Sequence, residues 1–224
     1  MASTKAPGTK KKPATRARGT SGVQLGEETA RALILQGAAR VFAERGVRAA
    51  SVAHILETAN VARRTFYRFY ESKEDVLMAL YHAGTEGLLA AWKHATSRAH
   101  APIEQLELCT DAHLLNARGL GRLVFVLGGE AQRYESPLHA RRLQVHDELV
   151  QMLCQAQPSP VDPLLVRGVV IALEGIARAT LLEGDEGRSV SPTSLARARA
   201  SMLRLAAAAL FAEDARVPGL PALA

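Results

Sequence analysis

The stretch that most constrains the fold of this chain is residues 51–70, SVAHILETANVARRTFYRFY. Ser51 can cap a short helix, and the apolar residues on the inward face of that helix are Val52, Ile55 and Leu56. The helical pattern breaks at residues 58–61 and starts again near Ala62, in a segment crowded with basic and hydroxyl side chains. Two short helices joined by a tight turn, the second of them basic, predict a helix-turn-helix whose second helix enters the major groove of DNA.

The positive charge of the chain is concentrated where this motif lies. Residues 1–75 hold 14 Lys and Arg against 7 Asp and Glu, whereas residues 76–224 hold 14 against 15. This distribution is typical of a nucleic-acid-binding head on a near-neutral body. A basic tail that only keeps the chain soluble is the alternative.

The rest of the chain reads as helices, since strand-like alternation is nearly absent and aromatic residues make up only 4%. Residues 27–45 form a supporting helix that stops at Gly46, and Ser72 caps a long helix to about Ser97 that joins head to body. Further helices fill residues 98–212. Breaks between or within them are expected at Gly119, Gly121 and Gly128-Gly129, and in two loops, one marked by Pro158, Pro160 and Pro163 and the other at residues 184–192.

The N-terminal part of the chain resembles a known family. The residues that carry the resemblance are Phe42, Gly46, Ser51-Val52, Ile55, Ala59-Asn60-Val61, Thr65-Phe66-Tyr67, Phe69-Tyr70 and Ser72-Lys73-Glu74. Over about residues 27–80 they resemble the N-terminal domain of TetR-family transcriptional regulators. The resemblance implies an all-α fold, with an N-terminal three-helix helix-turn-helix DNA-binding domain and a C-terminal helical domain for ligand binding and dimerisation.

The resemblance also implies which residues meet DNA. Tyr67 and Lys73 are expected at the DNA backbone, and Ser51 begins the first helix of the motif beside a phosphate. The full expected set is Ser51, Val52, Arg63, Arg64, Thr65, Tyr67, Arg68 and Lys73. Phe69 and Tyr70 are expected to pack against the first helix.

Four positions depart from the family pattern. Asn60 replaces the usual Gly, but Asn tolerates the left-handed conformation that the turn requires. Leu56 replaces a usual Ala, so packing between the helices must adjust. Ala62 replaces the usual Ser, so the recognition helix loses its side-chain cap. Arg64 replaces a small residue and adds a guanidinium that can pair with guanine or with a phosphate.

We divide the chain into four parts. Residues 1–26 are a disordered basic arm, which either follows DNA or acts as a solvated linker. Residues 27–75 form the DNA-binding domain, residues 76–214 the effector-binding and dimerisation domain, and residues 215–224 a frayed tail.

Two helices of the body suit a four-helix dimer interface. Residues 164–183 are apolar around most of their circumference, and the last helix is rich in alanine. The expected interface residues are Gly168, Leu173, Gly175, Ala198, Met202, Leu205 and Ala209. Packing of the same residues within one monomer is the alternative.

An effector pocket is expected in the body, with aromatic and polar lining. The candidate residues are Trp92, His113, Phe125, Tyr134, His139, His146 and Met152. Each has a plainer role open to it: Trp92 as a core residue, and the histidines as exposed or internally bonded groups. Glu174 and Arg178, four residues apart, could add to this lining but are expected to form an ion pair along one helix.

The sequence carries none of the phosphate-loop, dinucleotide, zinc-hydrolase or serine-hydrolase motifs, so we expect no enzyme, no metal and no cofactor. Cys109 and Cys154 suit two buried thiols in a reducing cytoplasm, with a redox switch as the alternative. The basic N-terminus is not followed by an apolar segment, so a secretory signal is not expected.

We therefore expect a cytoplasmic homodimer that binds a palindromic double-stranded DNA operator and acts as a repressor. A small-molecule effector would release it, with no role for a membrane. The alternative is a DNA-binding architectural protein that has no small-molecule effector.

Overall fold

The computed structural model describes residues 26–157, 160–182 and 190–211, and every regular element in these ranges is an α-helix, which confirms the all-α prediction. The elements in chain order are α1 Glu27–Ala49, α2 Val52–Ala59, α3 Arg63–Tyr67, α4 Lys73–Arg98, α5 Pro102–Leu120, α6 Leu123–Ala131, α7 Leu138–Gln155, α8 Pro163–Leu182 and α9 Pro192–Phe211. Apart from Gly26, the predicted arm lies outside the described residues, and so does the predicted tail.

Local signals in the first 75 residues act as the sequence predicts. Gly46 interrupts α1 with φ 72° and ψ 167°. Ser51 accepts a hydrogen bond from the backbone N–H of His54 and so caps α2. Asn60 adopts the left-handed conformation at the end of α2, with φ 50° and ψ 47°. Ser72 and Asp75 form a reciprocal capping box at the start of α4.

A close approach of two backbones fixes the angle between α1 and α2. Gly37 lies against Ala59, and a Cβ at Gly37 would stand only 2.6 Å from the Ala59 Cβ and 2.8 Å from its backbone nitrogen. No side chain fits in this space without moving α2, so a residue without a Cβ is required here.

The core of the head continues into the body. Ile34, Phe42 and Phe66 belong to one buried cluster that also contains Val76 of α4 and Leu127 of α6. Phe69 and Tyr70 pack against the same cluster, and the Arg31 guanidinium of α1 lies 4.8 Å from the centre of the Phe69 ring. The boundary that the sequence suggested between residues 75 and 76 therefore crosses a shared hydrophobic core.

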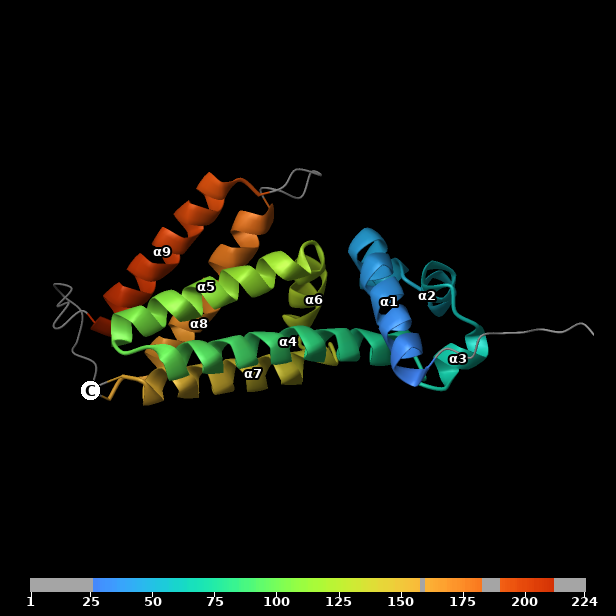
Figure 1. Cartoon of the computed structure of the whole chain (residues 1–224), viewed down its shortest axis with the longest axis horizontal. Helices are drawn as coiled ribbons and strands as arrows, with labels where there is room; N and C mark the ends of the chain where they lie inside the picture. The colour runs from blue at the N-terminus through green and yellow to red at the C-terminus, as the bar shows by residue number, and fades with distance from the viewer. Residues whose placement is uncertain (1–25, 158–159, 183–189, 212–224) are drawn as a thin grey trace, which may run out of the picture.

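Figure 1 shows α1, α2 and α3 gathered at one end of the molecule, while α4 and α7 run side by side along the body. A second core lies among α4, α5, α7, α8 and α9, with Trp92 fully buried in it. Cys109 is buried in this core as predicted, and burial raises the pKa of its thiol to about 12. Cys154 is only partly buried.

Two predicted helix breaks are wrong. Helix α5 continues through Gly119 and ends at Gly121, where φ is 53°. Helix α6 continues through Gly128 and Gly129 to Ala131. A glycine inside a helix costs only about 1 kcal/mol relative to alanine, so packing of the helix outweighs it. At Gly128 the Arg178 side chain lies 3.6 Å from where a Cβ would stand.

Candidate functional site

The recognition helix is a single short turn of helix that carries exposed arginines. Helix α3 spans five residues, and Ala62 before it provides no side-chain cap, as predicted. Arg63 and Arg64 are exposed, Tyr67 is 47% exposed, and Phe66 anchors the helix in the core. These side chains can therefore meet phosphates or base edges without disturbing the fold.

The first helix of the motif and the start of α3 offer less surface. Ser51 and Val52 are half-buried at the start of α2, and the Ser51 hydroxyl is engaged with the His54 N–H at 3.3 Å. Thr65 is also half-buried. The DNA contacts predicted for Ser51, Val52 and Thr65 remain predictions.

Lys73 has a structural task within the protein. Its Nζ donates hydrogen bonds to the carbonyl oxygens of Val47 and Ala50, each at 2.9 Å. These bonds tie the start of α4 to the segment that joins α1 and α2. An ammonium group has three donors, so one N–H is left for a DNA phosphate.

Arg68 contacts two other residues of the head. Its guanidinium bonds to the Glu27 carboxylate at 2.8 Å and lies 4.8 Å from the centre of the Phe69 ring. The two side chains of the ion pair are 48% and 73% exposed, so the pair is solvent-screened and weak. A DNA phosphate can compete for this arginine.

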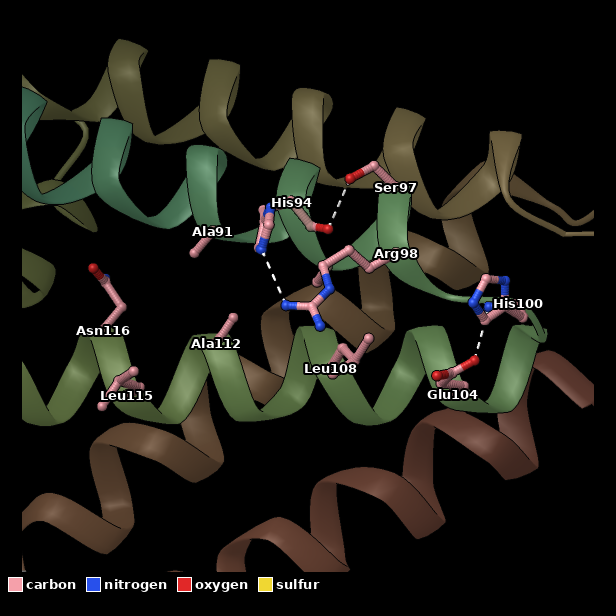
Figure 2. Close-up of a pocket in the computed structure, with 11 residues that line it drawn as sticks. Ala91, His94, Ser97, Arg98, His100, Glu104, Leu108, Ala112, Leu115 and Asn116 are labelled. Carbon is pink, nitrogen blue, oxygen red and sulfur yellow. Dashed lines mark hydrogen bonds between the residues drawn. The ribbon is translucent and has the colours of Figure 1, made fainter.

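The body has an open groove between α4 and α5, with a volume of about 720 Å³. Figure 2 shows His94 and Arg98 reaching from α4 across Leu108 and Ala112 of α5. The His94 and Arg98 side chains are 3.5 Å apart, and both are exposed. Because water solvates its polar groups, a small molecule gains little by binding in this groove.

An inner cavity of about 100 Å³ lies deeper, among α4, α5, α6, α7 and α8. None of its lining residues is exposed, and most of them are apolar. Its polar and charged lining residues are Tyr81, Thr85, His113, Asn116, Arg142, His146, Glu174 and Arg178. A concave space with an apolar wall and a few convergent polar and charged groups is the usual form of a ligand site.

Glu174 is the centre of the charged cluster in this cavity. Its Oε2 accepts a hydrogen bond from Arg142 at 2.8 Å and lies 3.2 Å from the His146 Nε2. Burial by itself would raise the pKa of Glu174, but the hydrogen bonds from His146 and Arg142 outweigh it and lower the pKa to about 2. The carboxylate is therefore ionised at neutral pH.

Two other titratable lining residues are neutral at pH 7. Burial lowers the pKa of His113 to about 4; the nearby charge of Glu174 opposes this shift, and His146 adds to it. Burial, together with nearby Glu174, raises the pKa of the Tyr81 phenol to about 12. Both groups can therefore act only as neutral hydrogen-bonding partners.

The predicted ion pair between Glu174 and Arg178 is wrong. Glu174 bonds instead to Arg142 and His146 of α7. The Arg178 Nε is buried and has no hydrogen-bond partner in the described part of the chain. Spacing along one helix could not show this, because the competing donors come from a helix about thirty residues earlier in the chain.

Of the seven predicted pocket residues, only His113 and His146 line the inner cavity. Trp92 is buried in the core, and Met152 packs against that core. Phe125 packs in a small cluster with Ala177 and Leu181. The other two are Tyr134, which is 84% exposed, and His139, whose Nδ1 lies 3.2 Å from the Ala131 carbonyl oxygen.

Sequence reasoning missed four polar lining residues: Tyr81, Thr85, Asn116 and Arg142. A signal for Arg142 existed in Glu174, a carboxylate within a largely apolar helix, since a buried charge needs a partner. The sequence did not reveal which arginine would supply it.

The predicted dimer residues divide into two groups. Leu173, Ala198 and Met202 are at most 3% exposed within the single chain, because they form the faces through which α8 and α9 pack on the body. Ala209 also packs against this core. Gly168 and Gly175 face open space, and Leu205 is 39% exposed.

Helix α8 presents a further apolar face that the protein does not cover. Leu164 is 73% exposed, Ile171 46% and Leu182 54%. Together with Gly168 and Gly175 these residues recur at helical spacing along one side of α8. The open face of α8 therefore includes two of the residues predicted for the interface, Gly168 and Gly175, whereas Leu173 faces the core.

No described helix is sufficiently long and apolar to cross a membrane. Among the described residues there is also no group of three or more His, Cys, Asp or Glu side chains placed to hold a metal ion.

Residues 34–80 match the family described as "Bacterial regulatory proteins, tetR family". The matched segment runs from α1 to the first third of α4 and includes the whole helix-turn-helix. None of the curated proteins compared with the chain matches it in sequence.

Solved structures share the fold over most of the chain. The fatty acid degradation regulator FadR from Bacillus halodurans is 19% identical, with a TM-score of 0.66 over 78% of this chain and 94% of its own. FadR from Bacillus subtilis in complex with stearoyl-CoA is 18% identical, with a TM-score of 0.62 over 80% and 97%. LfrR from Mycobacterium smegmatis, in complex with proflavine, is 22% identical, with a TM-score of 0.56 over 78% and 94%.

Proposed function

We propose that this chain, a transcriptional regulator of the TetR family, binds a palindromic operator as a homodimer and represses transcription until a small-molecule effector enters its inner cavity. The observation that carries this proposal is the position of α6. One part of α6 contributes Leu127 to the core of the head, and the same residue, with Val124 and Gly128, lines the inner cavity.

The operator-binding part of the proposal rests on α3. Arg63 and Arg64 are exposed there, and none of the ion pairs within the described residues involves them. An arginine in the major groove can bond to two acceptors of one guanine, which would give sequence preference. One helix of five residues buries little surface, so two copies would be needed for tight binding.

The dimer part of the proposal rests on the open face of α8. Leu164, Ile171 and Leu182 expose apolar surface along one side of this helix, and Gly168 and Gly175 would let a second helix approach closely. Leu205 of α9 is exposed as well. A second copy of the chain would cover this surface in a symmetric contact.

The effector part of the proposal rests on the shared core. A ligand between α4, α6 and α8 would press on residues that also support α1, and so would favour one orientation of the head over another. Similar folds bind small molecules: stearoyl-CoA in the FadR from Bacillus subtilis and proflavine in LfrR.

The first experiment is footprinting of the purified protein on genomic DNA, followed by binding measurements with and without effector candidates. We expect protection of two half-sites related by two-fold symmetry. Release from DNA by at least one small molecule would support the effector. An architectural protein without an effector would protect DNA with weak sequence preference and would resist release by every compound.

The second experiment measures the oligomeric state by light scattering. Ile171→Glu should convert the dimer to a monomer, because a charge in the centre of an apolar interface is costly. The matched control is Leu115→Glu on α5, which adds the same charge at a leucine that is 70% exposed. A dimer that survives Ile171→Glu but not Leu115→Glu would contradict the interface.

A further inference from the structure

The inner cavity has an uncompensated positive charge. Its lining contains the cations Arg142 and Arg178 and one anion, Glu174. Glu174 is already occupied, since one of its oxygens meets both Arg142 and His146. Arg178 is left without an acidic partner among the residues that the structure describes.

Three lining residues have a buried nitrogen atom that forms no hydrogen bond within the described chain: the Nε of Arg142 on α7, the Nε of Arg178 on α8 and the Nδ1 of His113 on α5. Of the two arginines, Arg142 is bonded to Glu174 through its Nη2, whereas no such carboxylate contact is formed by Arg178 in the described part of the chain. A buried polar group without a partner destabilises the protein, so a ligand that satisfied such a group would recover part of that cost. An acceptor with negative charge suits the guanidinium best.

The remaining wall of the cavity is apolar. Leu88, Leu149 and Val170 lie on three different helices around it, and Leu120 and Val124 add aliphatic surface beside Arg178. A ligand that carries only charge would leave this surface uncovered. The lining therefore fits a molecule with an anionic end and a short hydrocarbon part.

The volume limits the size of that molecule. The cavity encloses about 100 Å³. An apolar cavity of about 150 Å³ holds benzene, which has six non-hydrogen atoms, so in the same proportion this one holds roughly four. A long acyl chain such as that of stearoyl-CoA, which the FadR from Bacillus subtilis binds, exceeds this size.

We propose that the inner cavity binds a short-chain carboxylate, with the carboxylate bonded to the Arg178 guanidinium and the hydrocarbon part against the leucines and valines of the wall. This assignment rests on the proposed function, in which the inner cavity is the effector site. It adds the charge, the size and the anchoring residue of the ligand.

Binding can be followed on the full-length protein without DNA. Trp92 is the only tryptophan in the chain, and its ring lies 6.2 Å from that of His113, so its fluorescence reports on the cavity. The probes are acetate, propionate, butyrate and octanoate, with propionamide as the neutral match to propionate. We expect saturable changes in fluorescence with acetate and propionate, weaker changes with butyrate, and binding of octanoate and propionamide at least tenfold weaker than that of propionate.

Variants then test the anchoring residue. Arg178→Gln should weaken propionate binding about tenfold or more, whereas Arg178→Lys, which keeps the charge, should retain part of the affinity. The matched control is Arg204→Gln on α9, where an exposed arginine loses its charge and propionate binding should not change. If Arg178→Gln does not fold, the comparison of propionate with propionamide on the natural protein still decides whether charge is recognised.

Failure of this assignment can be told apart from failure of the proposed function. Equal binding of propionate and propionamide, or tighter binding of octanoate, would overturn the short-chain carboxylate even if another compound released the protein from DNA. Propionate that binds through Arg178 but leaves the protein on its operator would support the site and contradict its role as the effector site.

Discussion

Two pairs of arginines, one in the head and one in the body, lie in opposite environments. Arg63 and Arg64 are exposed on α3, where water solvates them and where we propose that DNA binds. Arg142 and Arg178 line an inner cavity in which no lining residue is exposed. Both have a buried Nε without a hydrogen-bond partner in the described chain, but Arg142 is also paired with Glu174, whereas no acidic partner of Arg178 lies in that part of the chain. If both proposals hold, the exposure of an arginine determines which partner it binds: a polyanion for the exposed pair, and one small anion for Arg178.

The largest effect is expected where α1 packs against α2 in the head. Gly37→Ala places a Cβ 2.6 Å from that of Ala59 and 2.8 Å from a backbone nitrogen, which forces α2 away from α1. We expect a loss of about 3 kcal/mol in the free energy of unfolding and a loss of DNA binding. Thermal melting and DNA titration measure both effects. Gly129→Ala is the control, because nothing lies within 4 Å of its Cβ position; an equal loss there would contradict this prediction.

The next largest effect is expected at the buried charges of the body. Glu174→Gln leaves Arg142 and Arg178 without an anion, and we expect it to lower the free energy of unfolding by about 2–3 kcal/mol. Denaturant titration at pH 7 measures this loss.

The same carboxylate gives the body a pH dependence. The pKa of Glu174 is lowered from 4.5 to about 2, so its contribution is fully present above pH 4.5 and is lost as the pH falls from 4.5 towards 2. The pKa of His113 is lowered from 6.5 to about 4, so its protonation also favours unfolding, but in the window between those values. In Glu174→Gln the stability should fall less steeply below pH 4.5; a slope equal to that of the natural protein would overturn the assignment.

Lys73 and Tyr67 are both predicted to contact DNA, but only Lys73 is also expected to stabilise the fold. Lys73→Ala removes the donor to two carbonyl oxygens, and we expect a loss of about 1–2 kcal/mol in stability in addition to weaker DNA binding. Tyr67→Ala should weaken binding to all DNA sequences alike and change stability little, because the side chain is 47% exposed. Unchanged melting of Lys73→Ala would mean that its two hydrogen bonds contribute nothing.

The smallest expected effect concerns the exposed ion pair of the head. Glu27→Gln should change the free energy of unfolding by less than about 1 kcal/mol, because both side chains of the pair are solvated. It should also free Arg68 and strengthen DNA binding modestly at low salt. Binding measured over a range of salt concentrations checks this, and weaker binding of Glu27→Gln at low salt would show that the pair holds Arg68 in its DNA-binding position.

The sequence predicted the head more closely than the body. The cap at Ser51, the left-handed Asn60 and the capping box of Ser72 all depend on groups within a few positions along the chain. Such signals survive into the folded state because nothing distant competes with them. The breaks expected at Gly119 and Gly128 failed because packing of α5 and α6 outweighs a cost of about 1 kcal/mol per glycine.

The sequence by itself therefore determined the all-helical fold, the helix-turn-helix and the excess of positive charge in the first third of the chain. Only the tertiary structure decided that Glu174 pairs with Arg142 and His146, that Arg178 is left over, and that α8 turns Leu173 inward and Ile171 outward. These features differ in how far apart along the chain the interacting residues lie. Caps and turns are set by neighbours in the chain, whereas the partner of a buried charge and the covered face of a helix are set by whichever other helices pack against them.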